Sequence, residues 1–255
     1  MILNKTRVIP VLLISDFGLY NTVNFKEPRY IGDPLNTIRI FNEKEVDELI
    51  ILDFLASKNN TIPNFSYLED IAGEAFMPLA YGGNLRSIHD VRQVFTLGFE
   101  KIVLNSSLFE NPSLVESVVK EYGSQSVIGS IDVKKNIFSS YKVYSKNATI
   151  KAKVELADLI TNLEQRGVGE LLVNSIDNDG CMNGYDLNLV KFVTDRVSIP
   201  VIACGGLSSI KDMSDAIYLA NASAVSGSSF FVYIGPHHAV LITYPDRDIL
   251  TKALP

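Results

Sequence analysis

Small residues that could hold an anion recur in both halves of this chain. They are two glycine pairs, Gly82-Gly83 and Gly205-Gly206, and two polar pairs, Asn105-Ser106 and Ser228-Ser229. Glycine permits positive φ and lets backbone N–H groups approach a phosphate, while Asn and Ser add hydrogen-bonding side chains. A single pair of this kind is more often a tight turn. Its repetition predicts one phosphate-binding site in each half of the chain.

Two aspartates follow apolar runs and could perform acid-base chemistry. Asp132 ends one run, and Asp179-Gly180 lies just beyond the next. A carboxylate in such a place can act as a general acid or base or hold a ligand hydroxyl, although it can also cap a helix or order a loop. We predict that Asp132 is catalytic and that Asp179 and Gly180 bind substrate.

The remaining reactive residue types give weaker signals. His89 lies in a helical segment and is expected at the surface, and His237 and His238 have no evident partner. Cys181 and Cys204 show no short Cys/His spacing that could build a zinc site. We therefore expect neither a metal nor an organic cofactor.

Eight β-branched or aliphatic runs alternate with segments of helical period and must position these residues. The runs are Thr6–Leu13, Leu49–Asp53, Pro78–Tyr81, Ile102–Leu104, Val127–Asp132, Leu171–Asn174, Pro200–Cys204 and Ser223–Ser226. Such alternation predicts a parallel α/β sheet. Asp33-Pro34 and Asn111-Pro112 each combine an N-cap side chain with a proline at the first helical position, so they predict two helix starts.

An internal repeat favours a closed barrel over an open sheet. Pro78–Gly83 recurs as Pro200–Gly206, Asp47–Ile51 as Gly169–Val173 and Asn105–Ser107 as Gly227–Ser229, a displacement of about 122 residues. We predict a single (β/α)8 TIM barrel domain over residues 1–255, with half-barrels of about 1–122 and 123–255. An open doubly wound sheet would leave the repeat unexplained. In a barrel, the carboxyl ends of the strands form the active site.

Charge and composition exclude several classes of partner. The net charge of −6 argues against binding to nucleic acid or to an anionic membrane, which require clustered Lys and Arg. Residues 1–5 lack the apolar core of a signal peptide. The stretch Ala216–Pro245 has no charged residue, but polar and glycine-containing segments interrupt it, so we predict a buried strand plus a loop. A cytoplasmic protein is expected.

Six segments together resemble the cyclase (HisF) subunit family of imidazole glycerol phosphate synthase over essentially the whole chain. They are Arg7–Pro10, Gly32–Pro34, Asp47–Leu49, Tyr122–Ser126, Asn183–Asp186 and Ser198–Ala203. The resemblance implies a barrel that receives ammonia from a glutaminase subunit docked on its N-terminal face. The ammonia would then react at the opposite face with a bisphosphorylated small molecule.

The family closes the ammonia entrance with two basic and two acidic side chains. All four positions are filled in kind, by Arg7, Glu48, Lys101 and Glu170. Charges inside a barrel are costly to bury unless they are paired. The resemblance therefore implies an ammonia gate, with a salt-bridged plug as the alternative.

The opposite face departs from the family pattern. Leu13 stands where the family has the first of two catalytic aspartates, and Asp16 is at best a displaced substitute. Asn21 replaces a loop lysine, Asn84 a third glycine and Asn174 a threonine that contacts substrate. Losing one of two acid-base groups typically lowers a rate by about 10²–10⁴. The resemblance thus implies that cyclase activity is lost or strongly reduced.

A paralogous branch of the family resembles this chain better, in Leu13 and in Ile40–Leu49 and His238–Pro245. That branch is associated with acetamidino modification of surface sugars in lipopolysaccharide or flagellar glycans. The resemblance implies a barrel subunit of a glutamine amidotransferase complex, with an ATP-using sugar amidotransferase as a further partner. The alternative functions are the lyase and cyclase step of histidine biosynthesis, and other phosphate-sugar chemistry without ammonia.

Overall fold

A closed barrel of eight parallel strands forms the centre of the computed structural model, which describes residues 6–255. Its strands are β1 (Arg7–Ser15), β4 (Leu49–Asp53), β5 (Leu79–Gly82), β6 (Lys101–Leu104), β7 (Val127–Lys135), β10 (Glu170–Ser175), β11 (Val201–Cys204) and β12 (Ala224–Gly227). Pairing of β1 with β12 closes the barrel, with Arg7 opposite Ala224. The predicted (β/α)8 fold is confirmed, and each of the eight predicted strands overlaps one of these.

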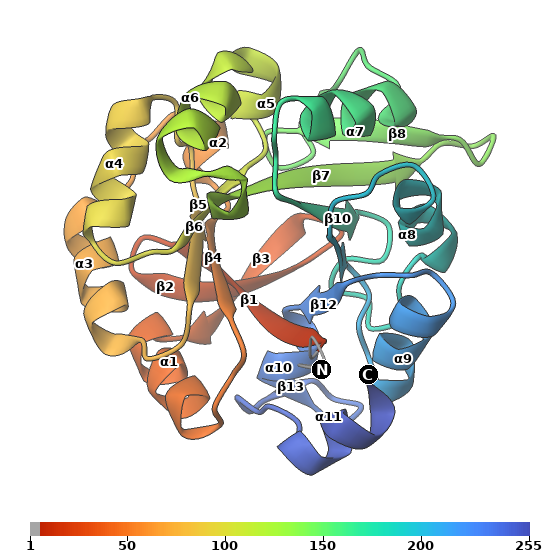
Figure 1. Ribbon diagram of the computed structural model, residues 1–255. Coiled ribbons are helices and arrows are strands. Elements are labelled where there is room, and N and C mark those ends of the chain that lie inside the picture. The colour runs from red at the N-terminus through yellow and green to blue at the C-terminus, as the bar shows by residue number, and fades with distance from the viewer. Residues whose placement is uncertain (1–5) are drawn as a thin grey trace.

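Helices surround the barrel and cover the outer side of its strands (Figure 1). The longer ones are α1 (Pro34–Glu43), α3 (Phe65–Glu74), α4 (Ile88–Thr96), α6 (Ser113–Tyr122), α7 (Leu156–Gln165), α8 (Leu187–Thr194), α9 (Ile210–Tyr218) and α11 (Arg247–Ala253). Short helical turns are α2 (Ala56–Asn59), α5 (Ser107–Glu110), η1 (Ser124–Ser126) and α10 (Ser229–Val232).

Alternation along the strands separates two apolar cores. On β1, Val8 and Leu12 belong to the large core between strands and helices, whereas Ile9 and Val11 belong to a smaller core inside the barrel. Successive strand residues point to opposite faces, so the period of two creates both layers from one run.

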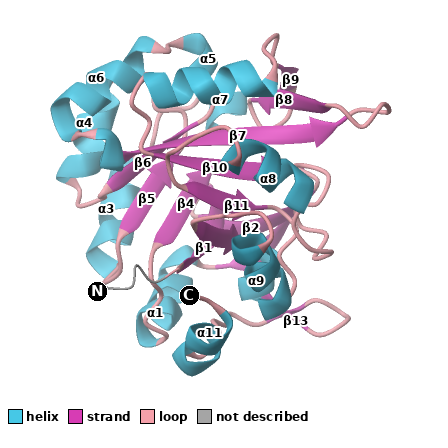
Figure 2. Cartoon of the chain, turned by 45° about the vertical axis from the view of Figure 1, so that its right-hand side comes forward, coloured by secondary structure: helices cyan, strands magenta, loops and turns pink. Residues whose placement is uncertain are grey.

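Further strands were not predicted from the sequence. They are β2 (Gly18–Val23), β3 (Lys26–Gly32), β8 (Tyr141–Ser145), β9 (Ile150–Lys151), β13 (Tyr233–Ile234) and β14 (Ala239–Val240). Strand β2 turns back antiparallel on the end of β1, and β3 pairs with β2. Strands β7 and β8 form an extension that projects past the barrel (Figure 2). The hairpin β2–β3 matters most here, because it extends from the carboxyl end of β1.

Two local predictions were wrong. Asn111 does not cap α6, whose N-cap is Pro112; it instead ends α5 as the C-cap, and its side chain donates to the Arg86 carbonyl. The stretch Ala216–Pro245 contains the end of α9, β12, α10 and the pair β13–β14, rather than one strand and a loop. Within residues 6–255 no helix is long and apolar enough to cross a membrane. The predicted lack of a signal peptide concerns residues 1–5, which lie outside the described residues.

The helix start at Asp33 is confirmed, and it leads to a stability prediction. The Asp33 carboxylate accepts hydrogen bonds from the backbone N–H groups of Leu35 and Asn36 at 3.3 and 3.2 Å. Asp33→Ala should lower the free energy of unfolding by about 1 kcal/mol, measured by urea denaturation. Asp246→Ala is the matched control, because Asp246 is the N-cap of α11 but makes no capping bond with its side chain. Equal losses in the two variants would contradict this role of Asp33.

Candidate functional site

The inward side chains form three levels along the barrel axis. On β1 the inward series begins with Arg7, continues through Ile9 and Val11, and ends with Leu13 at the carboxyl end. On β10 the corresponding series is Glu170, Leu172 and Asn174. The same period gives a charged level at the N-terminal end, an apolar middle level and a largely polar level at the carboxyl end.

A closed ring of four ion pairs occupies the N-terminal level. Lys101 Nζ lies 2.9 Å from Glu48 Oε1 and 2.7 Å from Glu170 Oε1, and the Arg7 guanidinium donates to the same two carboxylates. The Glu48 side chain is 3% exposed and that of Lys101 18%. The structure thus brings together all four residues that the resemblance assigned to a gate.

The ring keeps the Glu170 carboxylate charged in spite of burial. Burial acts to raise the pKa of Glu170, but hydrogen bonds from Arg7 and Lys101 outweigh it and leave the pKa below its usual range. Burial also opposes the charge on Arg7, yet its bonds to Glu170 and the charge of Glu48 raise the Arg7 pKa. Each charged form is therefore stabilised by its partners.

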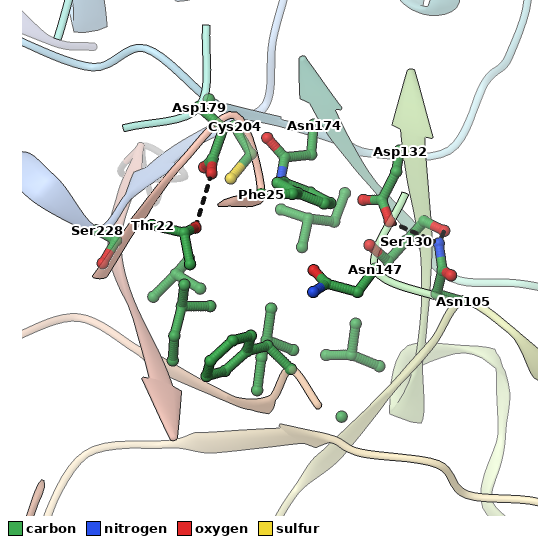
Figure 3. Close-up of a pocket in the computed structure, with 18 of the residues that line it drawn as sticks. Thr22, Phe25, Asn105, Ser130, Asp132, Asn147, Asn174, Asp179, Cys204 and Ser228 are labelled. Atoms are coloured by element: carbon green, nitrogen blue, oxygen red, sulfur yellow. Dashed lines mark hydrogen bonds between the residues drawn. The ribbon is translucent and has the colours of Figure 1, made fainter. Parts of the chain in front are cut away.

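A cavity at the carboxyl ends of the strands collects every residue predicted for the opposite face (Figure 3). Its lining includes Gly82, Gly83, Asn105, Ser106, Asp132, Asp179, Gly180, Gly205, Gly206, Ser228 and Ser229. We call this cavity the mouth. It brings residues from both halves of the chain into one site, whereas their chemical roles remain predictions.

Three carboxyl groups line the mouth, those of Asp53, Asp132 and Asp179, and Asp132 is buried. Asp132 accepts a hydrogen bond from Asn105 Nδ2 at 3.1 Å, and Asp179 accepts one from Thr22 Oγ1 at 3.2 Å (Figure 3). Burial, together with the charge of Asp179, raises the pKa of Asp132 to about 7. Burial also raises the pKa of Asp179 to about 7, although its bond to Thr22 acts in the other direction. Carboxyls of this kind can exchange a proton near neutral pH.

The two glycine pairs are required for different reasons. Gly205 and Gly206 have φ of +84° and +107°, as expected for backbone that opens toward a ligand. Gly82 and Gly83 do not have positive φ. A Cβ at Gly82 would lie 2.9 Å from the Val103 carbonyl oxygen, so close packing requires a glycine there. The left-handed position of this loop is Asn84, at φ +54°.

Sequence reasoning missed a second group of mouth residues. Thr22 and Phe25 reach the mouth from the hairpin β2–β3, Asn147 from the turn between β8 and β9, and Ser130 from β7 (Figure 3). The hairpin and the turn carry no apolar period that would have predicted their position. Ser130, by contrast, could have been found, because it lies two residues before Asp132 and faces the same side of the strand.

Asn174 and Leu13 complete the mouth as the sequence departures suggested. Both line it. Asn174 Oδ1 is buried and, among the described residues, has no hydrogen-bond partner. A buried acceptor without a donor is costly, so this atom can be satisfied by a ligand that brings an N–H or O–H group.

Of the remaining candidates, Cys204 lines the mouth (Figure 3), whereas the histidines and Cys181 are not part of its lining. His89 is exposed on α4, as predicted, and His237 and His238 lie in the β13–β14 turn, where His238 stacks on Tyr233. Cys181 and Cys204 are free thiols, and burial raises the pKa of Cys204 to about 12. No group of three or more His, Cys, Asp or Glu residues between residues 6 and 255 is placed to hold a metal ion.

Comparisons with known proteins agree with this architecture. The family model described as "Histidine biosynthesis protein" matches residues 7–234. The chain is 48% identical over 242 residues to a provisionally named imidazole glycerol phosphate synthase subunit hisF2 of Pseudomonas aeruginosa, covering 95% of this chain and 96% of that protein. A provisionally named subunit HisF of Leptospira interrogans is 42% identical, with 96% of each chain covered. The subunit HisF of Alkaliphilus metalliredigens is 35% identical, covering 89% of this chain and 90% of that protein.

The ring predicts a large stability cost for removing one charge. Glu48→Gln would leave Arg7 and Lys101 to share Glu170 alone, so we expect a loss of about 3–5 kcal/mol in the free energy of unfolding. The matched control is Glu74→Gln, which breaks the exposed pair with Arg39 and should cost about 0–1 kcal/mol. Urea denaturation measures both, and similar losses would show that the ring is not held by mutual pairing.

The mouth carboxyls predict a distinctive pH dependence. Because the folded state holds their protons more tightly than the unfolded chain, each stabilises the fold fully below its ordinary pKa of about 4. That contribution is lost as the pH rises toward about 7. Asp132→Asn should therefore flatten the decline in unfolding free energy between about pH 4 and pH 7. Ser130→Ala changes a side chain in the same pocket without removing a titratable group, so it should keep the wild-type dependence of the unfolding free energy on pH. Parallel profiles for Asp132→Asn and wild type would rule the explanation out.

Proposed function

The chain belongs to the histidine biosynthesis protein family as a HisF-like member, and from this premise we propose that it is the ammonia-receiving barrel of a glutamine amidotransferase complex. The complex would serve acetamidino modification of a surface-glycan sugar. In this role, Arg7, Glu48, Lys101 and Glu170 form the gate through which ammonia from a glutaminase subunit enters. The glutaminase docks on the N-terminal face, and an ATP-using sugar amidotransferase receives ammonia at the mouth, in the cytoplasm.

The proposal rests on one observation: the barrel has a ring of paired charges at one end, an apolar interior, and a polar mouth at the other end. Between the ring and the mouth lie Ile9, Ile50, Ile128 and Ile202, and the apolar interior continues into the mouth lining with Val11, Val103 and Leu172. A paired ring rejects free ions, and an apolar interior disfavours charged species while a small neutral amine can pass. Stability alone is a weak reason for such a ring, because apolar residues of similar volume are often as stable as a buried ion-pair cluster.

Asn174 supports arrival of ammonia at the mouth. Its buried Oδ1 accepts no hydrogen bond within the described residues and lies at the end of the apolar interior. Ammonia carries N–H donors, so it can satisfy an acceptor that the fold leaves unsatisfied. The carboxyls of Asp132 and Asp179 border the same cavity and can then bind or protonate the acceptor of the ammonia.

Leu13 argues against the alternative cyclase function. It lines the mouth at the end of β1, and a leucine side chain can neither donate nor accept a proton. Asp132 and Asp179 remain as acid-base groups, which is the observation in favour of cyclase chemistry. The test therefore has to separate ammonia delivery from cyclisation.

The first test is glutamine hydrolysis by the partner glutaminase with and without this chain, together with turnover of the bisphosphorylated histidine-pathway intermediate under excess ammonium. We expect faster glutamine hydrolysis when the chain is present. Turnover of the intermediate should stay far below roughly 1 per second. Leu13→Asp supplies a carboxylate at this position and should raise the turnover of the intermediate. The control is Leu13→Asn, whose side chain has the shape of Asp but supplies no general acid or base.

Either part can fail on its own. Wild-type turnover at roughly 1 per second or more would establish the cyclase function instead. An unstimulated glutaminase would remove the ammonia-receiving role itself.

A further inference from the structure

The two predicted phosphate-binding sites differ in this structure, because a side chain fills one of them. Asn21 on β2 is 3% exposed. Its Nδ2 donates to Ser229 Oγ at 3.0 Å and to Ser228 Oγ at 3.2 Å, and its Oδ1 accepts from Ser229 Oγ at 3.2 Å. The carboxamide thereby engages both hydroxyls that the second half of the chain offers to an anion.

Further contacts hold Asn21 in place by fastening the hairpin β2–β3 to the loop after β10. Asn24 Nδ2 donates to the carbonyls of Ile176 and Asp177 at 3.0 and 2.7 Å, and its backbone N–H donates to the Asp179 carbonyl at 2.8 Å. Gly180 lies so close beneath the hairpin that a Cβ there would collide with the Thr22 carbonyl.

The site in the first half is open. Ser106 has no hydrogen bond from its side chain to any described residue, and it lines the mouth beside Gly83. A second hollow shares Ser107 with the mouth and is lined by Arg86 and Lys146. Lys146 pairs with Glu110, and among the described residues the Arg86 guanidinium bonds to the amide oxygens of Asn84 and Asn60 rather than to a carboxylate. The charge of Arg86 therefore lies in the hollow that adjoins the open site at Ser107.

We propose that Asn21 is a specificity-determining residue: it fills the second phosphate-binding site, so the mouth takes ligands with a single phosphate group, bound beside Gly83 and Ser106, with Arg86 in the adjoining hollow. This inference deepens the proposed function and rests on it, because it names the class of ligand that meets ammonia at the mouth. A singly phosphorylated sugar is such a ligand, whereas a bisphosphorylated substrate finds one of its two sites occupied.

Titration calorimetry of the purified chain with inorganic phosphate tests the proposal. Wild type should bind one phosphate per chain, and Asn21→Ala should bind two, because the mutation frees Ser228 and Ser229. Asn21→Ser is a second variant with a shorter polar side chain, and it should also admit the second phosphate. Circular dichroism and thermal unfolding verify that each variant is folded.

A matched pair of charge insertions identifies the occupied site. Ser106 and Ser228 each precede a short helix, where an aspartate is well tolerated as an N-cap. Ser106→Asp should weaken phosphate binding at least about tenfold through like-charge repulsion, whereas Ser228→Asp should leave it unchanged.

Three results would overturn the proposal: two phosphates bound by wild type, no binding at millimolar phosphate, or the reverse pattern for the two aspartate variants. An unchanged stoichiometry in both Asn21 variants would reject the role of Asn21. Since neither glutaminase nor ammonia is present, failure here leaves the glutaminase test of the proposed function untouched.

Discussion

The closed ring of Arg7, Glu48, Lys101 and Glu170 constrains the rest of the barrel. The two carboxylates are buried and the two cations half-buried at the starts of their strands, and each charge pairs with two opposite charges from across the barrel, so the strands must close in one register. A slip of one residue would turn every inward side chain outward. The apolar middle level and the polar mouth follow from that register, because both continue the same alternation along the strands that the ring begins.

Burial has opposite consequences at the two ends of the barrel. At the ring, cations outweigh desolvation and lower the pKa of Glu170, so its carboxylate stays charged. At the mouth, neither Asp132 nor Asp179 pairs with a cation within residues 6–255, and burial raises both pKa values to about 7. Acidic side chains thus supply a fixed negative charge at the ring and an exchangeable proton at the mouth. The difference depends on whether a cation lies beside the carboxyl group.

The sequence predicted the barrel more completely than the mouth. The strands were predictable because β-branched runs and their period are local signals, and the ring was predicted because the resemblance covers those positions. Asn111 misled because an Asn before Pro is also a good end for the preceding turn, here α5. The hairpin β2–β3 could not be predicted: β3 is mostly exposed, and Asn21 and Asn24 are held by residues more than 150 positions away.

Because the chain is internally duplicated, the difference between its two phosphate-binding sites is informative. The two halves carry matching glycine and serine segments, so equal sites at the two matching strand ends would be the expectation from sequence alone. Each half carries an antiparallel extension at the matching strand end, β2 and β3 after β1 and β8 and β9 after β7. Asn21 of the first extension hydrogen-bonds to Ser228 and Ser229, whereas no side chain of residues 141–151 does so to Asn105 or Ser106. A side chain on one extension can therefore make one of two similar sites unavailable without altering the site itself. The residue that differs is Asn21 on the hairpin, while Ser228 and Ser229 keep the pattern of Asn105 and Ser106. For barrels built from two halves, the segment that covers a site is thus as important for ligand choice as the residues that form it.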